Sequence, residues 1–167
     1  MPHQIIGKPT VYVETSIISY LTGRPSRDTL IRGDQGLTRR WWEQRRHLYR
    51  LFVSPQVIEE SASGDASAAE RRLKALAGLE SLVSTLETEE LVGRLRRALI
   101  IPDKSAVDAF HLAFAVIYEL DYLLTWNCTH LANAQTLRLL ADFCRAESLW
   151  LPIICTPREM LPERKVE

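Results

Sequence analysis

Acidic side chains stand where apolar runs of this sequence end or begin. Glu14 directly follows the run VYV, and Asp108 lies early in SAVDAFHLAFA. The segment SPQVIEES carries two adjacent acids, Glu59 and Glu60. Like charges repel, and a divalent cation relieves that repulsion when a fold brings carboxylates together. Oxygen ligands with little Cys or His favour Mg²⁺ or Mn²⁺, so these residues suggest a metal site built from carboxylates.

Each of these residues also has an ordinary structural explanation. Glu14 alone could be a polar residue that ends a strand. Asp108 could complement the dipole of its helix. Its neighbours Val107 and Phe110 are apolar, however, and a buried carboxylate is costly unless it is paired, capping or bound to a metal. His111, three residues on, we interpret as a hydrogen-bonded core histidine rather than a ligand.

The elements that must position these acids alternate along the chain. The apolar patterns predict strands at residues 10–13, 49–53, 82–85, 121–125 and 152–154. They predict helices at residues 17–21, 38–48, from 56 onward, 68–79, 87–99, 103–120 and 134–146. Residues 23–36 are predicted to be rich in turns, and residues 61–69 to form a loop.

Such alternation predicts a single α/β domain over residues 1–167, with a parallel sheet that is covered on both faces. Ligands of these sheets bind beyond the carboxyl ends of the strands, where the strand order reverses. Glu14 follows the first predicted strand, and Asn127 follows the strand at 121–125. Both residues therefore fall on the side of the sheet where a site is expected.

Several other classes of site lack their motifs. The sequence has no Cys-x-x-Cys pair and no His-Glu-x-x-His, which argues against zinc, and no glycine-rich phosphate loop, which argues against nucleotide cofactors. Its three cysteines have no disulfide-framework spacing and fit a reducing interior. No apolar run reaches the length of a membrane span, and MPHQIIGKPT holds no long apolar stretch. We therefore expect a cytoplasmic protein that makes no membrane contact.

The net charge is zero, from 21 basic and 21 acidic residues, and gives no case for nucleic acid by itself. The arginines nevertheless form two groups, at positions 39, 40, 45, 46 and 50 and at positions 94, 96 and 97. We interpret them as solvated helix faces, with contact to phosphate as the alternative. Trp41 and Trp42 must face different ways on a helix, so we expect one in the core. The other would meet a protein partner or, alternatively, stack on a base.

Four segments, VYVETSIISYL, SPQVIEES, AVDAFHLAFAVIYELDYLLTWNCTHLAN and PIICTPREML, span nearly the whole chain. In order and spacing they resemble the PIN-domain family, and within it the VapC-like toxins of bacterial toxin–antitoxin pairs. The resemblance implies a three-layer α/β fold with a mainly parallel sheet of roughly five strands flanked by helices. It also implies a Mg²⁺- or Mn²⁺-dependent endoribonuclease, with RNA as substrate, a cognate antitoxin as partner, and a homodimer.

The same resemblance implies which residues form the site. Glu14, Glu60 and Asp108 would be catalytic metal ligands, and Asn127 would hold the fourth catalytic position. Glu60 fits the family's glutamate better than Glu59 because a small residue follows it, although Glu59 stays open. The family usually has aspartate where Glu14 stands, and often has aspartate where Asn127 stands. The longer Glu14 displaces its carboxylate by roughly one bond length, and the lost charge at Asn127 weakens the case for a second metal.

These departures leave an alternative function open. A catalytically weak or inactive PIN-fold module could bind RNA or a protein partner through the same surface. A phosphatase or signalling receiver would need a nucleophilic aspartate after the first strand, where this chain has Glu14. We therefore set that class aside.

Overall fold

A computed structural model of the chain describes residues 7–98 and 100–162. Residues 1–6, which belong to the N-terminal stretch considered above, and residue 99, the predicted end of one helix, lie outside the described residues. The strands are β1 (Thr10–Val13), β2 (Arg50–Val53), β3 (Glu80–Ser81), β4 (Tyr122–Leu124) and β5 (Ile153–Cys155). The α-helices are α1 (Thr15–Thr22), α2 (Thr29–Gln44), α3 (Pro55–Ala62), α4 (Ala66–Leu76), α5 (Leu86–Arg97), α6 (Ala106–Ile117) and α7 (Ala134–Ala146).

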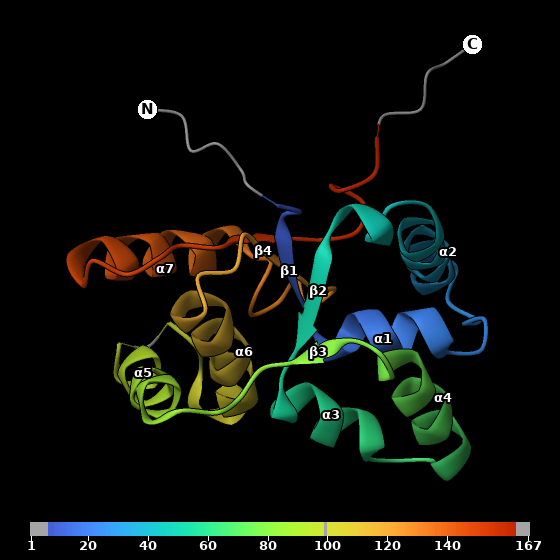
Figure 1. Cartoon of the computed structure of the whole chain (residues 1–167), viewed down its shortest axis with the longest axis horizontal. Helices are drawn as coiled ribbons and strands as arrows, with labels where there is room; N and C mark the ends of the chain where they lie inside the picture. The colour runs from blue at the N-terminus through green and yellow to red at the C-terminus, as the bar shows by residue number, and fades with distance from the viewer. Residues whose placement is uncertain (1–6, 99, 163–167) are drawn as a thin grey trace.

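The five strands form one parallel sheet in the order β3-β2-β1-β4-β5. Figure 1 shows α1, α2 and α4 on one side of this sheet and α5, α6 and α7 on the other. The predicted fold class, an α/β protein with a parallel sheet flanked by helices, is confirmed. Strands β2 and β3 lie on one side of β1, and β4 and β5 lie on the other, so the strand order reverses at β1. The carboxyl ends of β2, β1 and β4 are therefore neighbours.

The central strands are buried because they are apolar on both faces, as parallel strands under two helical layers must be. Val11, Tyr12 and Val13 of β1 are completely buried, and Leu123 and Leu124 of β4 are as well. Helix α6 supplies the largest continuous part of the core on its side of the sheet, over residues 112–116. The predicted central position of this helix is confirmed.

Side-chain caps fix where several helices begin. Ser54 accepts the backbone N–H of Val57 at 3.3 Å, and Pro55 occupies the first helical position, so the predicted start of α3 is confirmed. Trp41 is completely buried in α2, as expected of one member of the tryptophan pair. Trp42 is partly buried and carries the guanidinium of Arg46 4.5 Å from its ring centre.

The prediction of turns over residues 23–36 is wrong from Thr29 onward. Asp28 accepts the N–H groups of Leu30 and Ile31 and starts α2 there, nine residues before the predicted start at 38. Gly33 and Gly36 lie inside this helix, where each costs about 1 kcal/mol relative to alanine. The cap and the buried face of the helix outweigh that cost. The helix ends at Gln44 and a 3₁₀ turn covers Arg46–Leu48, so the prediction of one helix through 48 is also wrong.

Two further predictions are wrong in position. The segment 61–69 is not one loop, because α3 continues to Ala62 and Asp65 caps α4 from Ala66. The strand expected at 82–85 lies earlier, at Glu80–Ser81. The other predicted elements differ from the observed ones by up to three residues at their ends.

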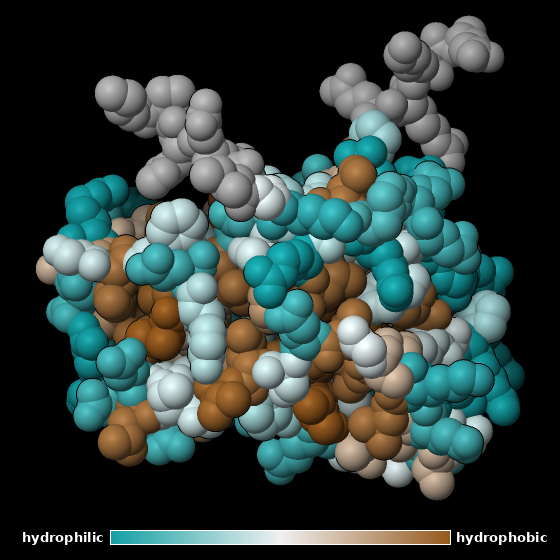
Figure 2. Space-filling view, in the orientation of Figure 1, coloured by the Kyte–Doolittle hydropathy of each residue, from teal (hydrophilic) through white to brown (hydrophobic). Residues whose placement is uncertain are grey.

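Apolar surface is visible on the face of the molecule that carries β3, in patches separated by hydrophilic surface (Figure 2). After β3, Val83 and Leu86 leave 67% and 78% of their surface exposed. No helix of the described residues is both long enough and apolar enough to cross a membrane.

Candidate active site

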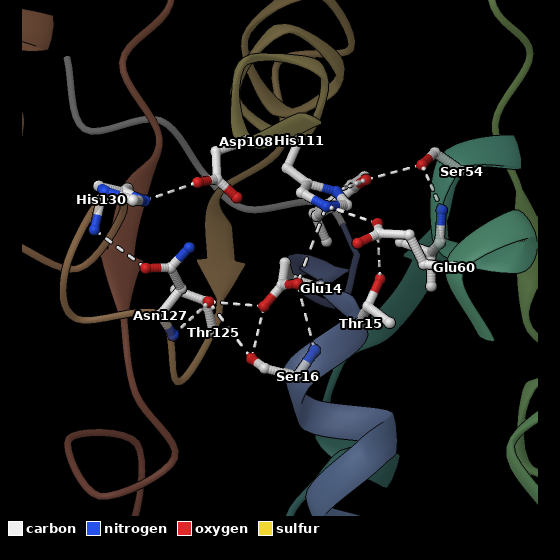
Figure 3. Close-up of polar contacts among 12 residues, drawn as sticks. Glu14, Thr15, Ser16, Ser54, Glu60, Asp108, His111, Thr125, Asn127 and His130 are labelled. Carbon is white, nitrogen blue, oxygen red and sulfur yellow. Dashed lines mark hydrogen bonds and ion pairs between the residues drawn. The ribbon is translucent and has the colours of Figure 1, made fainter. Parts of the chain in front are cut away.

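The candidate site lies at the carboxyl edge of the sheet, beside the point where the strand order reverses. Glu14 directly follows β1, Ser54 follows β2, and Thr125 follows β4. Helix α3 adds Glu60, and the first turn of α6 adds Asp108. Figure 3 shows Glu14 in the middle, with Glu60 and Thr15 on one side and Asp108, Asn127 and His130 on the other.

Glu14 is buried, and local hydrogen bonds hold its carboxylate. One oxygen, Oε1, accepts the backbone N–H of Ser16 at 3.2 Å, which caps α1. The other, Oε2, accepts the hydroxyl of Ser16 at 2.5 Å and that of Thr125 at 2.7 Å. The Ser16 hydroxyl oxygen in turn accepts the backbone N–H of Trp126 at 2.8 Å. Glu14 therefore joins the end of β1, the start of α1 and the loop after β4.

His111 lies completely buried beneath the acids. Its Nε2 is 2.9 Å from Oε1 of Glu60 and 3.8 Å from Oε1 of Glu14. The Nε2–H bond is not aimed at either oxygen, so these contacts have the distance of an ion pair without the alignment of a hydrogen bond. On its other side, Nδ1 lies 2.7 Å from the hydroxyl of Tyr12, which lies 2.7 Å from Oγ of Ser54. The prediction of a hydrogen-bonded core histidine is confirmed, but this histidine also faces the site.

The charges around His111 favour its protonated form. Burial lowers the pKa of His111, yet the nearby carboxylates of Glu60, Glu14 and Asp108 outweigh that effect and raise it. Burial likewise raises the pKa of Glu60, but His111 and the hydroxyl of Thr15 outweigh it, so the net pKa is lowered. Acids from three parts of the chain thus lie around one buried imidazole and favour its protonated form.

Glu60 is half-buried, and the hydroxyl of Thr15 donates to its Oε1 at 3.0 Å. Glu59, the alternative left open above, is exposed on the outer face of α3. Of the two adjacent acids, the structure therefore places Glu60 at the site.

Asp108 forms a second acid–histidine pair. Its Oδ2 lies 3.0 Å from Nδ1 of His130. Burial raises the pKa of Asp108, and the opposing effects of His111, His130 and the side-chain amide of Asn127 only partly offset this, so the pKa is raised. The side-chain oxygen of Asn127 accepts the backbone N–H of His130 at 2.9 Å. Asn127 therefore shapes the loop with its oxygen and faces Asp108 with its amide.

The donor chemistry of this site suits a hard divalent cation, because carboxylate oxygens dominate it and a positive charge is already favoured at its centre. Within residues 7–98 and 100–162, however, no three His, Cys, Asp or Glu side chains lie close enough together to hold one ion. Each acid is instead engaged by a hydroxyl or a histidine. An ion bound by Glu60 and Asp108 would compete with His111 and His130 for the same oxygens. The metal-ligand set stays a prediction.

The sequence placed His130 beside Asn127 after a predicted strand, but sequence reasoning assigned no role to His130 or to Tyr12. Histidine 130 follows Asn127 by three residues on a loop after a strand, which is a usable signal for a side chain at the site. Tyr12 stands in the middle of an apolar strand, and nothing in its neighbours along the chain shows that its hydroxyl reaches the histidine on α6. Contacts of this kind depend on how α6 packs against β1, which the local sequence does not reveal.

No family model matches the sequence, and no curated protein matches it. Solved structures do match the fold. VapC20 of Mycobacterium tuberculosis, described as a Sarcin-Ricin loop cleaving toxin, superimposes with a TM-score of 0.57 and 16% identity, over 72% of this chain and 92% of that one. VapBC2 from Rickettsia felis, bound to a DNA fragment from the promoter, gives a TM-score of 0.50 and 16% identity, over 88% of this chain and 98% of that one. The chain has the PIN-like fold of these VapC proteins, and the predicted fold family is confirmed at the level of fold.

Proposed function

We propose that this protein is a Mg²⁺- or Mn²⁺-dependent endoribonuclease of the VapC type, the toxin of a toxin–antitoxin pair. The observation that carries the proposal is the meeting of Glu14, Glu60 and Asp108 around one buried imidazole at the carboxyl edge of the sheet. Acids from three separate elements that stabilise a positive charge are what a cation-dependent hydrolase needs. The fold shared with VapC20 supports the same reaction class.

The acids differ in how far a substrate could reach them. The side chains of Glu60 and Asp108 are 31% and 16% exposed, whereas that of Glu14 is 8% exposed. Glu60 and Asp108 would thus bind the ion, and the ion would contact the scissile phosphate. Glu14 would contribute negative charge from below and hold Ser16 and Thr125 in place. When bound, the cation would neutralise charge on the phosphoryl oxygens and lower the pKa of a coordinated water.

A basic groove beside the start of α6 supports RNA as the substrate. It has a volume of about 350 Å³ and is lined by Gly93, Arg96, Arg97 and Asp103. Arg96 lies 3.5 Å from Asp103, while Arg97 forms no ion pair within the described part of the chain. A free guanidinium suits a backbone phosphate, and local arginines of this kind would let a protein of zero net charge bind RNA.

We also infer a protein partner, a cognate antitoxin, and a homodimer. One structural neighbour was solved as VapBC2 bound to promoter DNA, which supports a two-component system by analogy. The exposed Val83 and Leu86 after β3 add apolar surface of a kind that partners cover. Expression of the protein without its partner should arrest growth, and healthy growth with abundant soluble protein would contradict the toxin role.

Calorimetric titration of Mn²⁺ into the purified protein, with Asp108→Asn as the matched variant, tests the site directly. We expect binding by the wild-type protein, loss of most of that binding in Asp108→Asn, and RNA cleavage that follows the same pattern. Cleavage by Asp108→Asn at the wild-type rate would overturn the assigned role.

The alternative is a PIN-fold module that binds RNA or a protein without cutting. The observation in its favour is the engagement of every acid by a hydroxyl or histidine, with no three-ligand cluster within the described residues. RNA binding without Mn²⁺ binding and without cleavage would establish this reading.

A further inference from the structure

An aromatic pair lies directly beside the candidate site. The rings of Tyr20 and Trp126 are stacked, with centres 5.9 Å apart and planes inclined by 19°. Both side chains are partly exposed. Trp126 stands in the chain between Thr125 and Asn127, two residues of the site. The pair is therefore next to the acids rather than on a remote surface.

Hydrogen bonds connect the pair to Glu14. The backbone N–H of Trp126 donates to Oγ of Ser16, and that hydroxyl donates to Glu14. Tyr20 follows Ser16 by four residues on α1, so its side chain lies one turn along the same helix face. Ser16 therefore links the carboxylate of Glu14 to the backbone of Trp126, one member of the aromatic pair.

The indole of Trp126 is fixed in orientation. Its Nε1–H donates to the buried hydroxyl of Thr38 at 2.7 Å, and Thr38 donates to the backbone oxygen of Asp34 at 2.7 Å. The polar edge of the ring is therefore satisfied inside the protein. A ring held in this way loses little entropy when a flat ligand stacks against the pair.

An exposed arginine lies near the residues that hold the pair. Asp34 is the residue whose backbone oxygen accepts the Thr38 hydroxyl beneath the indole, and it also carries a carboxylate. Arg158 lies 3.3 Å from the same carboxylate, and its side chain is 68% exposed. An arginine near an aromatic face can contact the phosphate next to a stacked base, and Arg158 would do so in exchange for its ion pair with Asp34.

Among residues 7–98 and 100–162, the other aromatic contacts do not combine partial exposure with a place at the site. Trp41 contacts Tyr49 with ring centres 5.9 Å apart, but Trp41 is completely buried. Tyr12 and Phe114 stack inside the core. The Tyr20–Trp126 pair combines partial exposure with a place at the site.

We propose that the Tyr20–Trp126 pair is a stacking platform for an unpaired base of the substrate, next to the phosphodiester bond that is cut. This inference rests on the proposed ribonuclease function and specifies its substrate as single-stranded at that nucleotide. Tyr20 presents the ring against which the base stacks, and Trp126 supports Tyr20 from behind. The role is one of binding and positioning, since neither ring carries a group that reacts.

The test measures binding without cleavage. Fluorescence anisotropy follows a labelled single-stranded RNA of random sequence, and a probe of the same length whose riboses carry no bases, in EDTA. All proteins carry Asp108→Asn. The variants are Tyr20→Leu, which removes the ring, and Tyr20→Phe, which keeps it. Trp150→Leu is the matched control, because Trp150 is 41% exposed and lies just before β5, away from the site.

We expect Tyr20→Leu to weaken RNA binding about tenfold, the effect of losing one stacked base, and Tyr20→Phe and Trp150→Leu to bind as the parent does. On the probe without bases, Tyr20→Leu should equal the parent. Parent-like RNA binding by Tyr20→Leu, or the same weakening on both probes, would overturn the platform alone. No RNA binding by the parent, together with no cleavage by wild type, would overturn the proposed function itself.

Discussion

Nε2 of His111 lies 2.9 Å from Oε1 of Glu60, inside the protein and beneath the acids of the candidate site. The imidazole is completely buried, whereas the carboxylate is partly exposed. The carboxylates raise the pKa of this imidazole, so they favour a positive charge beneath the acidic rim of the site. Glu60 is therefore stabilised by His111 in the absence of a metal ion. A metal ion that binds Glu60 would have to compete with this contact.

Replacing His111 should therefore be costly. His111→Gln leaves Glu60 and Glu14 without the neighbouring positive charge, and we expect the free energy of unfolding to fall by about 3 kcal/mol. Urea denaturation checks this value. Tyr12→Phe is the control, because it keeps the imidazole, loses only a hydroxyl, and should cost about 1 kcal/mol. Equal losses for the two variants would show that the charge of His111 contributes nothing.

Glu14→Asp should keep RNA cleavage, because aspartate can still cap α1 at Ser16. The shorter side chain should lose the hydroxyl of Thr125, which donates to Glu14 at 2.7 Å, at a cost of about 1 kcal/mol in stability. Thr125→Val removes the same contact from the other side. The double variant should then be no less stable than the worse single variant, and additive losses would contradict the contact's importance. A folded but inactive Glu14→Asp protein would show that the longer side chain is required.

Asn127→Asp should restore a charge at the fourth catalytic position. The amide of Asn127 now lowers the pKa of Asp108, whereas a carboxylate there would repel it. We expect the metal-free protein to lose about 1 kcal/mol of stability and to bind Mn²⁺ roughly tenfold more tightly. Calorimetry of both proteins side by side measures the second effect. Unchanged Mn²⁺ affinity would place any ion away from Asn127.

Arg97→Ala should weaken RNA binding and lower its dependence on salt. Loss of one phosphate contact to a single strand reduces the slope of log affinity against log salt by about 0.7. Arg145→Ala is the matched control, because Arg145 is 78% exposed, lies on α7 and pairs with Asp142. A slope that falls equally in both variants would show only a general effect of net charge.

The cysteines should react unequally in the folded protein. Burial, with a smaller effect of Glu159, raises the pKa of Cys155 to about 12, and burial raises the pKa of Cys144 as well. Only thiolates react with iodoacetamide, so both residues should stay unmodified at pH 8. Cys128 is exposed, although burial of part of its side chain and the carboxylates of Asp34 and Glu159 raise its pKa too, so it should react slowly at pH 8 and faster as the pH rises. Mass spectrometry counts the modified sites, and three rapid modifications without denaturant would contradict the burial described here.

The fold was largely predictable because strand and helix signals in this chain are local. The apolar run 11–13 and the Ser54–Pro55 start of α3 each depend on a few adjacent residues. The start of α2 was mispredicted because Gly33 and Gly36 weaken the local pattern, while the buried face that stabilises the helix depends on tertiary packing. The glycines and charged residues of segment 23–36 suggested turns, but tertiary packing stabilises a helix from Thr29 onward.

The candidate site was predictable in its acids but not in their partners. Glu14 and Asp108 follow from their positions after a strand and at a helix start, whereas the choice of Glu60 over Glu59 rested on the resemblance to the PIN-domain family. The pairing of Asp108 with His130 depends on how the loop after β4 folds back, which Asn127 determines through its own hydrogen bond. Such contacts join residues that are far apart in sequence, and no periodicity encodes them.

The hydrogen-bonded contacts that join Ser54, Tyr12 and His111 should be detectable by proton NMR. These groups lie inside the protein, and the imidazole has no surface through which water can reach it directly. The ring N–H protons should therefore exchange slowly and give resolved downfield signals in a proton NMR spectrum recorded in water. Those signals would serve as an internal reporter, because an ion or a nucleotide that enters the site must disturb the imidazole at its centre.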